Sequence, residues 1–283
     1  MLAAGLAGGT LSEPAVAETL LKSGQNWETS SRSLAGALVL KVKGKTEDVA
    51  VGPATISDAK AFLWVAKSSE LRNLQVDDVK LTNLKQEGIR LDGDATGVSI
   101  ANFDFSMRDA QDTDYPAGII LNSGTDILIR DGRLSGFRSP TAKGDYPQGD
   151  GVSAERGVSK LTITGVSASG NADGGYDLKS SETRLDDLRA EDNYRNYRLW
   201  GSVEAGRLES RNPRGAHLWA GKGADIRIAE FVVSSDTDAP ILQIDGAKRV
   251  QIDHCVLSVP EGTSTVSGNA SNAELILDES CKL

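Results

Sequence analysis

A pattern of paired short strands recurs along most of this 283-residue chain. Each unit has a short stretch of alternating apolar and polar residues, a polar turn, and, six or seven residues later, a second short aliphatic stretch. Five units show it well: "GIRLDGDATGVSI" (88–100), "GIILNSGTDILI" (118–129), "GVSAERGVSKLTI" (151–163), "GYDLKSSETRL" (175–185) and "ILQIDGAKRVQI" (241–252). A repeat of this kind constrains the fold strongly, because single units bury their apolar face only by stacking on neighbours.

The spacing of the units predicts one coil for about every 25 residues. The central inward residues of the first strands are taken as anchors: Leu40, Val65, Leu91, Leu121, Ala154, Leu178, Leu199, Trp219 and Ile244. Successive anchors lie 20 to 33 residues apart. Short strands at this period, without helices between them, predict an all-β protein, a right-handed parallel β-helix of about nine coils. A β-sandwich is the alternative, but no Asn-Gly or Asp-Gly pair consistently joins adjacent strands as hairpins would require.

The two ends of the chain are expected to differ from the coils between them. We expect residues 1–36 to hold an export-signal remnant and an N-terminal cap, and residues 37–283 to form the β-helix. The segment "SEPAVAETLLKSG" (12–24) can form a short amphipathic capping helix with Ser12 as N-cap. A small apolar run at the start of the chain and the Ala-Val-Ala site (15–17) within this segment resemble an export signal, which predicts a periplasmic or secreted protein; a flexible tail is the alternative.

Charge and composition limit the kinds of molecule that the chain is expected to bind. A net charge of -9 leaves no basic surplus for general nucleic-acid binding. No apolar run reaches the roughly 18 to 20 residues of a membrane span. The two histidines offer no zinc-ligand spacing, and Cys255 and Cys281 either form a disulfide or remain two buried thiols. We expect a monomer.

Two insertions interrupt the period, at about residues 107–117 and 136–150, and end alike in "DTDYPAG" and "KGDYPQGDG". Loops that precede consecutive strands of one sheet would stand as walls beside it. The sheet between them would present Asn122, Glu155, Asp177, Lys179 and Arg198 outward, and coils about 4.8 Å apart would bring the last four within roughly 10 Å. We therefore expect a substrate groove here. Cross-strand ion pairs that only keep the surface soluble are the alternative.

Further candidates lie close to this floor. Five arginines between residues 195 and 214, among them Arg195 and Arg214, form a positive strip suited to a carboxylate-bearing ligand, and Trp200 could stack on a sugar. Tyr176, Tyr197 and His217 are predicted to point inward as a core ladder. His217 is also kept as a candidate substrate-binding residue.

The coil pattern resembles that of the pectate-lyase-like β-helix superfamily over roughly residues 37–283. The resemblance implies lyases and epimerases that act on uronate-containing polysaccharides, often with calcium, so an acidic polysaccharide is the expected partner. A resident metal site is not predicted, although Asp145, Asp150 and Glu155 could supply oxygen ligands. In this interpretation Arg198 and Arg195 neutralise the uronate carboxylate, Lys179 removes the C5 proton, and Tyr146 protonates the leaving oxygen. Asp177 is a further candidate catalytic residue.

Two other functions remain open. "NADGGYD" (171–177) is similar to the Asn-Thr-Asp-Gly-x-Asp signature of the polygalacturonase family on the same fold, with one added glycine. That similarity implies inverting hydrolysis, with Asp150, Asp173 and Asp177 as its acids and base. The family's later Asp-Asp, Gly-His-Gly and Arg-x-Lys elements do not follow in order. The third possibility is a non-catalytic saccharide-binding protein.

Overall fold

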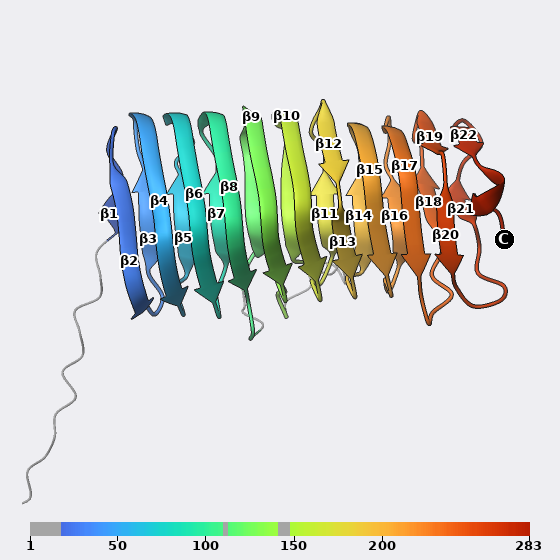
Figure 1. Ribbon diagram of the computed structural model, residues 1–283, viewed down its shortest axis with the longest axis horizontal. Helices are drawn as coiled ribbons and strands as arrows, with labels where there is room; N and C mark the ends of the chain where they lie inside the picture. Colours follow the sequence, from blue (N-terminus) through green and yellow to red (C-terminus); the bar gives the residue numbers. More distant parts are fainter. Residues whose placement is uncertain (1–17, 110–112, 141–147) are drawn as a thin grey trace, which may run out of the picture.

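The computed structural model describes residues 18–109, 113–140 and 148–283, which form a parallel β-helix of about ten turns (Figure 1). Every pairing between its strands is parallel, as the 25-residue repeat predicted. The first half of the chain forms β1 (Thr19–Leu20), β2 (Asn26–Ser33), β3 (Leu38–Val42), β4 (Lys45–Ser57), β5 (Ala61–Val65), β6 (Glu70–Thr82), β7 (Glu87–Leu91), β8 (Asp94–Ser106) and β9 (Ala117–Ser135). The middle forms β10 (Asp150–Ser169), β11 (Gly174–Leu178), β12 (Thr183–Asp186), β13 (Leu188–Glu191), β14 (Arg195–Leu199) and β15 (Ser202–Arg211). The last coils contain β16 (Ala216–Ala220), β17 (Asp225–Ser234), β18 (Leu242–Asp245), β19 (Arg249–Ile252), β20 (Cys255–Ser258), β21 (Val266–Asn269), β22 (Glu274–Leu277) and the short 3-10 helix η1 (Glu279–Cys281).

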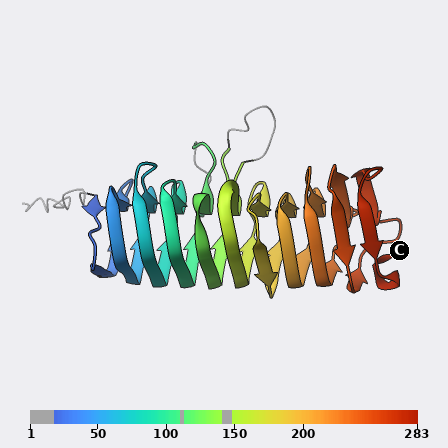
Figure 2. The same cartoon turned by 90° about the horizontal axis from the view of Figure 1, so that it is seen from above.

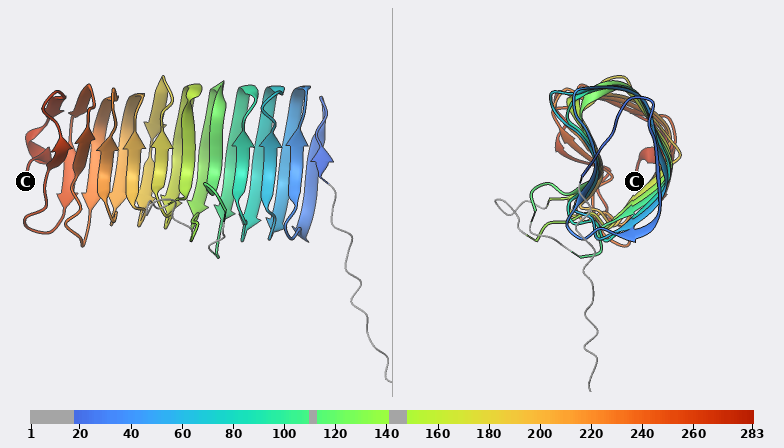
Figure 3. Two further views of the ribbon diagram at one scale, coloured as in Figure 1. Left: turned by 180° about the vertical axis from the view of Figure 1, so that it is seen from behind. Right: turned by 90° about the vertical axis from the view of Figure 1, so that its left-hand side faces the viewer.

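The strands stack into three columns along the axis, and seen end-on the coils superimpose (Figure 3). The first column contains β1, β3, β5, β7, the starts of β9 and β10, then β11, β14, β16, β18 and β21. The long strands β4, β6, β8, β9 and β10 turn a corner, so each supplies both the second and the third column. In the next coil β12 and β13 take these two places separately.

Aliphatic residues in register fill the interior. In the first column Val65, Leu91, Leu121, Ala154, Leu178 and Leu199 follow one another from coil to coil, and all are fully buried. Burying one such aliphatic side chain contributes about 1.5 to 3 kcal/mol. Each residue of the stacked ladder therefore stabilises the coils on either side of it, and the predicted alternation of inward and outward residues is confirmed for these coils.

Two buried tyrosines extend the ladder, as predicted. The rings of Tyr176 and Tyr197 stack with centroids 5.4 Å apart and planes 6° apart. Each hydroxyl donates to a backbone carbonyl across the interior: Tyr176 to Val166 at 2.6 Å, and Tyr197 to Glu209 at 2.8 Å. Burial raises the pKa of both phenols well above the usual value.

The predicted register is wrong in the β16 coil. Trp219 pairs with Arg198 and Gln243, which places it on the outward side, while Leu218 and Ala220 point inward. The error is a shift of one residue, which exchanges the two faces of a strand. At the other end of the chain Val42, not Leu40, is in register with Val65; because the offset is two residues, Leu40 still faces inward.

The predicted N-terminal helix is wrong where the structure describes it. From residue 18 onward the chain forms β1, which pairs with β3, and Leu21 continues this pairing by donating its N–H to the Lys41 carbonyl at 2.8 Å. The exposed edge of β3 supplies hydrogen-bond partners that a helix would not use. Residues 12–17, including Ser12 and the signal-like Ala-Val-Ala site, lie outside the described residues. The β-helix thus begins before residue 37.

At the C-terminal end β21 and β22 are regular strands in register with β18 and β19. A disulfide joins Cys255 in β20 to Cys281 in η1, so it ties η1 to the last coils. The described parts of the two long connections, β8 to β9 and β9 to β10, project from one side of the solenoid (Figure 2). No helix of the described chain is long and apolar enough to cross a membrane.

Candidate functional site

Charged residues gather on the outward face of the first column where β10, β11 and β14 lie side by side. Ser153, Asp177 and Arg198 occupy equivalent positions in these coils, as the alternation predicted. Trp219 follows Arg198 in the next coil. Asp150 and Arg195 lie at the first residues of β10 and β14, and Asp173 immediately precedes β11. We call Asp150, Asp173, Asp177, Arg195 and Arg198 the carboxylate–arginine cluster.

Arg198 links two carboxylates of this cluster. Its Nη1 lies 2.6 Å from Asp173 Oδ2 and 3.1 Å from Asp177 Oδ2. Side-chain exposure is only 12% for Arg198 and 7% for each aspartate. Arg195 adds a second guanidinium 3.7 Å from Asp173. Because these charges are largely removed from water, their mutual attraction is screened much less than at an exposed surface.

Two tryptophans border the cluster. The indole nitrogen of Trp200 donates to Asp177 Oδ1 at 2.8 Å, so both oxygens of Asp177 are held. The rings of Trp200 and Trp219 meet edge to face with centroids 4.3 Å apart, and the Arg198 guanidinium lies 5.5 Å from the Trp219 ring centre. The predicted surface position of Trp200 is therefore confirmed, whereas Trp219 was missed because it was placed inside.

Asp150 differs from its neighbours in electrostatic environment. Its Oδ1 accepts a hydrogen bond from the Gly174 N–H at 2.7 Å. Burial, and then the nearby charges of Asp173 and Asp177, raise the pKa of Asp150 well above the usual value, although Arg198 opposes the shift. The neutral, proton-bearing form of Asp150 is therefore favoured more than in an ordinary aspartate.

The Gly-Gly pair of "NADGGYD" leaves room for this arrangement. A Cβ at residue 174 would lie 2.7 Å from Asp150 Oδ1, and one at residue 175 would lie 2.7 Å from the Asn196 carbonyl oxygen. Both glycines belong to β11, so they do not form the turn before the strand. Glycine is needed here because a carboxylate and a backbone approach closely.

Buried asparagines hold the turns that lead into β11 and β14. Asn171 Oδ1 accepts from the Phe137 N–H at 3.0 Å, and Asn193 Oδ1 accepts from the Asn171 N–H at 3.0 Å. Arg214, predicted to bind substrate, donates to the carbonyl oxygens of Asn171 and Ala172 at 2.9 and 3.0 Å. Arg214 thus supports the turn that positions Asp173.

Lys179 reaches the edge of the cluster as an ion-paired cation. Its Nζ lies 2.5 Å from Glu155 Oε1 and 3.8 Å from Asp177 Oδ2. A general base needs a free electron pair directed at the substrate, whereas this Nζ faces two carboxylates. The outward position predicted for Lys179 and Glu155 is confirmed, but their pairing does not favour Lys179 as a base.

The other predicted residues lie apart from the cluster. Asn122 donates to Asp92 Oδ1 at 2.5 Å, in a separate group nearer the N-terminus where Trp64 and Arg90 also donate to Asp92. Burial tends to raise the pKa of Asp92, but these hydrogen bonds outweigh it and hold the pKa below the usual value. Tyr146 and Asp145 lie outside the described residues.

His217 does not face the surface. It is fully buried, its Nδ1 lies 2.8 Å from Ser210 Oγ, and burial lowers its pKa to about 4. Its role as a substrate-binding residue is therefore not supported, because no part of the imidazole reaches solvent. It is inward as predicted, but it aligns with Asn196, one residue before the tyrosine ladder.

The predicted positive strip is divided by the fold. Arg195 and Arg198 lie in the first column, whereas Arg207 and Arg211 lie on β15. There Arg207 pairs with Glu230 at 3.4 Å, and Arg211 pairs with Glu191 at 3.5 Å. Of these five arginines, Arg195 and Arg198 therefore belong to the candidate site.

The described residues form no group of three or more His, Cys, Asp or Glu side chains arranged to hold a metal ion. Two hollows that they do form, of about 640 and 870 Å³, are lined from the second and third columns and not by the carboxylate–arginine cluster. The groove predicted from the two insertions depends in part on residues 110–112 and 141–147, which lie outside the described residues.

Comparison with known proteins identifies the fold. No family model and no curated protein sequence matches this chain. Among solved structures, pectate lyase Pel9A matches with a TM-score of 0.51 and 13% identity, covering 90% of this chain and 70% of its own. The Dettilon tailspike protein matches with a TM-score of 0.51 and 13% identity, covering 92% of this chain and 59% of its own. The chain therefore has the pectate-lyase-like parallel β-helix fold, and identity this low shows no activity.

Proposed function

We propose that this chain is an enzyme that acts on an acidic polysaccharide, and that it hydrolyses a glycosidic bond with the carboxylates of the carboxylate–arginine cluster. The observation that carries the proposal is the contrast between these carboxylates. Asp150 has a strongly raised pKa, while Asp173 and Asp177 contact the Arg198 guanidinium. A carboxyl group with a raised pKa beside carboxylates that contact a cation is typical of a general acid next to a general base.

The roles follow from this contrast. Asp150 would donate its proton to the glycosidic oxygen as the bond to the anomeric carbon breaks. Asp177 would accept a proton from a water molecule whose oxygen attacks that carbon, as in inverting hydrolysis. Trp200 and Trp219 would contact a sugar ring beside the cluster, and Arg195 would attract the sugar's carboxylate.

β-Elimination, or C5 epimerisation, at a uronate is the second candidate. The pectate lyase named above shares the fold, and Arg195 with Arg198 would supply the cations that make a C5 proton acidic. However, Arg198 already contacts Asp173 and Asp177, and Lys179 already forms an ion pair with Glu155. These pairings support hydrolysis over elimination.

Four variants separate the two chemistries on a polysaccharide that the wild type degrades. Hydrolysis predicts that Asp150→Asn and Asp177→Asn each lower reducing-end release by about 10²–10⁴-fold, while Lys179→Ala retains most of it. The matched control is Asp253→Asn. Asp253 is an exposed carboxylate on the surface of the β-helix, and it forms an ion pair with Arg227. If instead Lys179→Ala abolishes turnover while both asparagine variants remain active, and all four unfold like the wild type, elimination replaces hydrolysis.

A further inference from the structure

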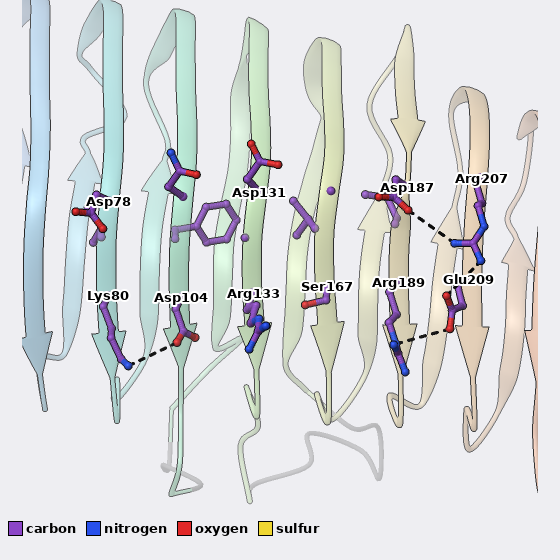
Figure 4. A pocket seen from close by; sticks show the side chains of 17 residues that line it. Asp78, Lys80, Asp104, Asp131, Arg133, Ser167, Asp187, Arg189, Arg207 and Glu209 are labelled. Carbon is purple, nitrogen blue, oxygen red and sulfur yellow. Dashed lines mark hydrogen bonds and ion pairs between the residues drawn. The ribbon is translucent and has the colours of Figure 1, made fainter.

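A hollow of about 640 Å³ lies on a different face of the β-helix, at the corner between the second and third columns (Figure 4). Side chains from β6, β8, β9, β10, β13 and β15 line it, so it extends across six successive coils. Coils are spaced about 4.8 Å apart, which gives the hollow an elongated shape parallel to the axis. Its dimensions suit an extended chain more than a compact small molecule.

The corner creates one rim of this hollow. Its residues share left-handed backbone conformations that turn the chain sharply: Asp78 (φ 52°), Asn102 (φ 50°), Asp131 (φ 54°), Gly165 (φ 62°) and Asp187 (φ 47°). Asp, Asn and Gly are the residues that adopt this conformation most readily. The same turn that closes each coil therefore places a row of polar groups along the hollow.

The opposite rim is a row of outward residues in register. From coil to coil it consists of Lys80, Asp104, Arg133, Ser167, Arg189 and Glu209. Ion pairs occupy both ends of the row: Lys80 lies 3.9 Å from Asp104, and Arg189 lies 3.8 Å from Glu209 (Figure 4). The middle of the row is different.

Arg133 in the middle is an exposed guanidinium without an ion pair or side-chain hydrogen bond to any residue of the described ranges. Beside it Ser167 and Gly165 have little or no side chain, which leaves the hollow open there. The floor is kept low by Gly132, where a Cβ would lie 2.1 Å from the Phe103 ring. A free arginine fork next to an open, polar recess is suited to a carboxylate.

We propose that this hollow binds a linear polysaccharide in which carboxylate-bearing sugars alternate with longer neutral stretches, and that Arg133 binds the carboxylate. Rows of polar groups at the coil spacing match an extended chain of hydroxyl-rich rings. The lining contains five acidic and four basic side chains, so a polymer with a carboxylate on every sugar would be repelled. The site lies on another face from the carboxylate–arginine cluster and does not depend on the proposed hydrolysis.

The test is affinity electrophoresis of the full chain in native gels that contain one of three polymers. Gellan carries a carboxylate on one sugar of each repeat, polygalacturonate carries one on every sugar, and dextran carries none. The variants are Arg133→Ala, which removes the fork, and Ser167→Trp, which fills the recess. Arg72→Ala is the matched control, because Arg72 is an exposed arginine on β6 outside the hollow.

We expect gellan to retard the wild type and Arg72→Ala equally, with dextran and polygalacturonate causing less retardation. Arg133→Ala and Ser167→Trp should each bind gellan roughly tenfold or more weakly, because one charge-assisted contact is lost or blocked. The proposal is overturned if gellan does not retard the wild type, or if Arg133→Ala is retarded like Arg72→Ala. Stronger retardation by polygalacturonate that depends on Arg133 would overturn the spacing of charges that we infer.

Discussion

Removing the Arg198 guanidinium tests whether the carboxylate–arginine cluster is built as described. Arg198→Ala leaves Asp173 and Asp177, each with 7% side-chain exposure, without the cation that lies 2.6 and 3.1 Å from them. Removing one partner of a buried ion pair costs about 3 to 5 kcal/mol, because the remaining charge is uncompensated. Arg195, 3.7 Å from Asp173, compensates part of this charge, so we expect the lower end, about 3 kcal/mol.

Urea unfolding of Arg198→Ala beside Arg227→Ala measures the effect. Arg227 also lies 3.1 Å from a carboxylate, that of Asp253, but the two side chains are 62% and 36% exposed. An exposed pair contributes about 0 to 1 kcal/mol, so the control should unfold almost like the wild type. Adding Asp173→Asn to Arg198→Ala should restore part of the lost stability, because it removes one of the two carboxylates that Arg198 contacts. An Arg198→Ala loss no larger than that of Arg227→Ala would refute the reasoning.

The remaining predictions concern the core, the candidate site and the C-terminal disulfide. Tyr176→Ala should lower the free energy of unfolding by about 3 kcal/mol or more, since the ring is fully buried and stacked; unchanged unfolding would contradict the inward assignment. Gly174→Ala should reduce activity roughly a hundredfold with only a small change in unfolding temperature, because the added Cβ displaces the Asp150 carboxylate. Cys281→Ser should cost about 3 to 4 kcal/mol, from the 26-residue separation that the disulfide closes, and reduction of the wild type should have the same effect. The pKa of Asp150 is raised in the folded state. The stability that its proton confers is therefore present below the unfolded-state pKa of about 3.9, and it is lost as the pH rises through the folded-state pKa. Asp150→Asn should remove this pH dependence of the free energy of unfolding, measured by urea titration at several pH values.

The fold could be predicted from the sequence because its repeat and its alternation act together. Where alternation is clear, as in "GIRLD", the inward and outward residues were assigned correctly. In "AHLWA" (216–220) every residue is buried, so the pattern does not show which residues face inward and which face outward. Only the register with β14 and β18 shows that Trp219 faces outward. Residues 18–24 belong to a stretch with the composition of a helix, but Thr19 and Leu20 form β1, because pairing with β3 outweighs local propensity.

The candidate site was predictable only in part, for the same reason. Asp177, Lys179 and Arg198 lie on strands in clear phase, so their shared face followed from the spacing. Their partners did not: Arg198 binds Asp173 from a turn, and Lys179 is paired with Glu155. The raised pKa of Asp150 depends on burial and on two carboxylates from another coil, which no local pattern contains.

The most direct test of the central claim is to incubate the protein with polygalacturonate, alginate and gellan, and to measure reducing ends and ultraviolet absorbance in the same samples. The account predicts new reducing ends from at least one polymer without a rise in absorbance, because hydrolysis creates no double bond. Absorbance that rises together with the reducing ends would establish elimination and contradict hydrolysis by the carboxylate pair.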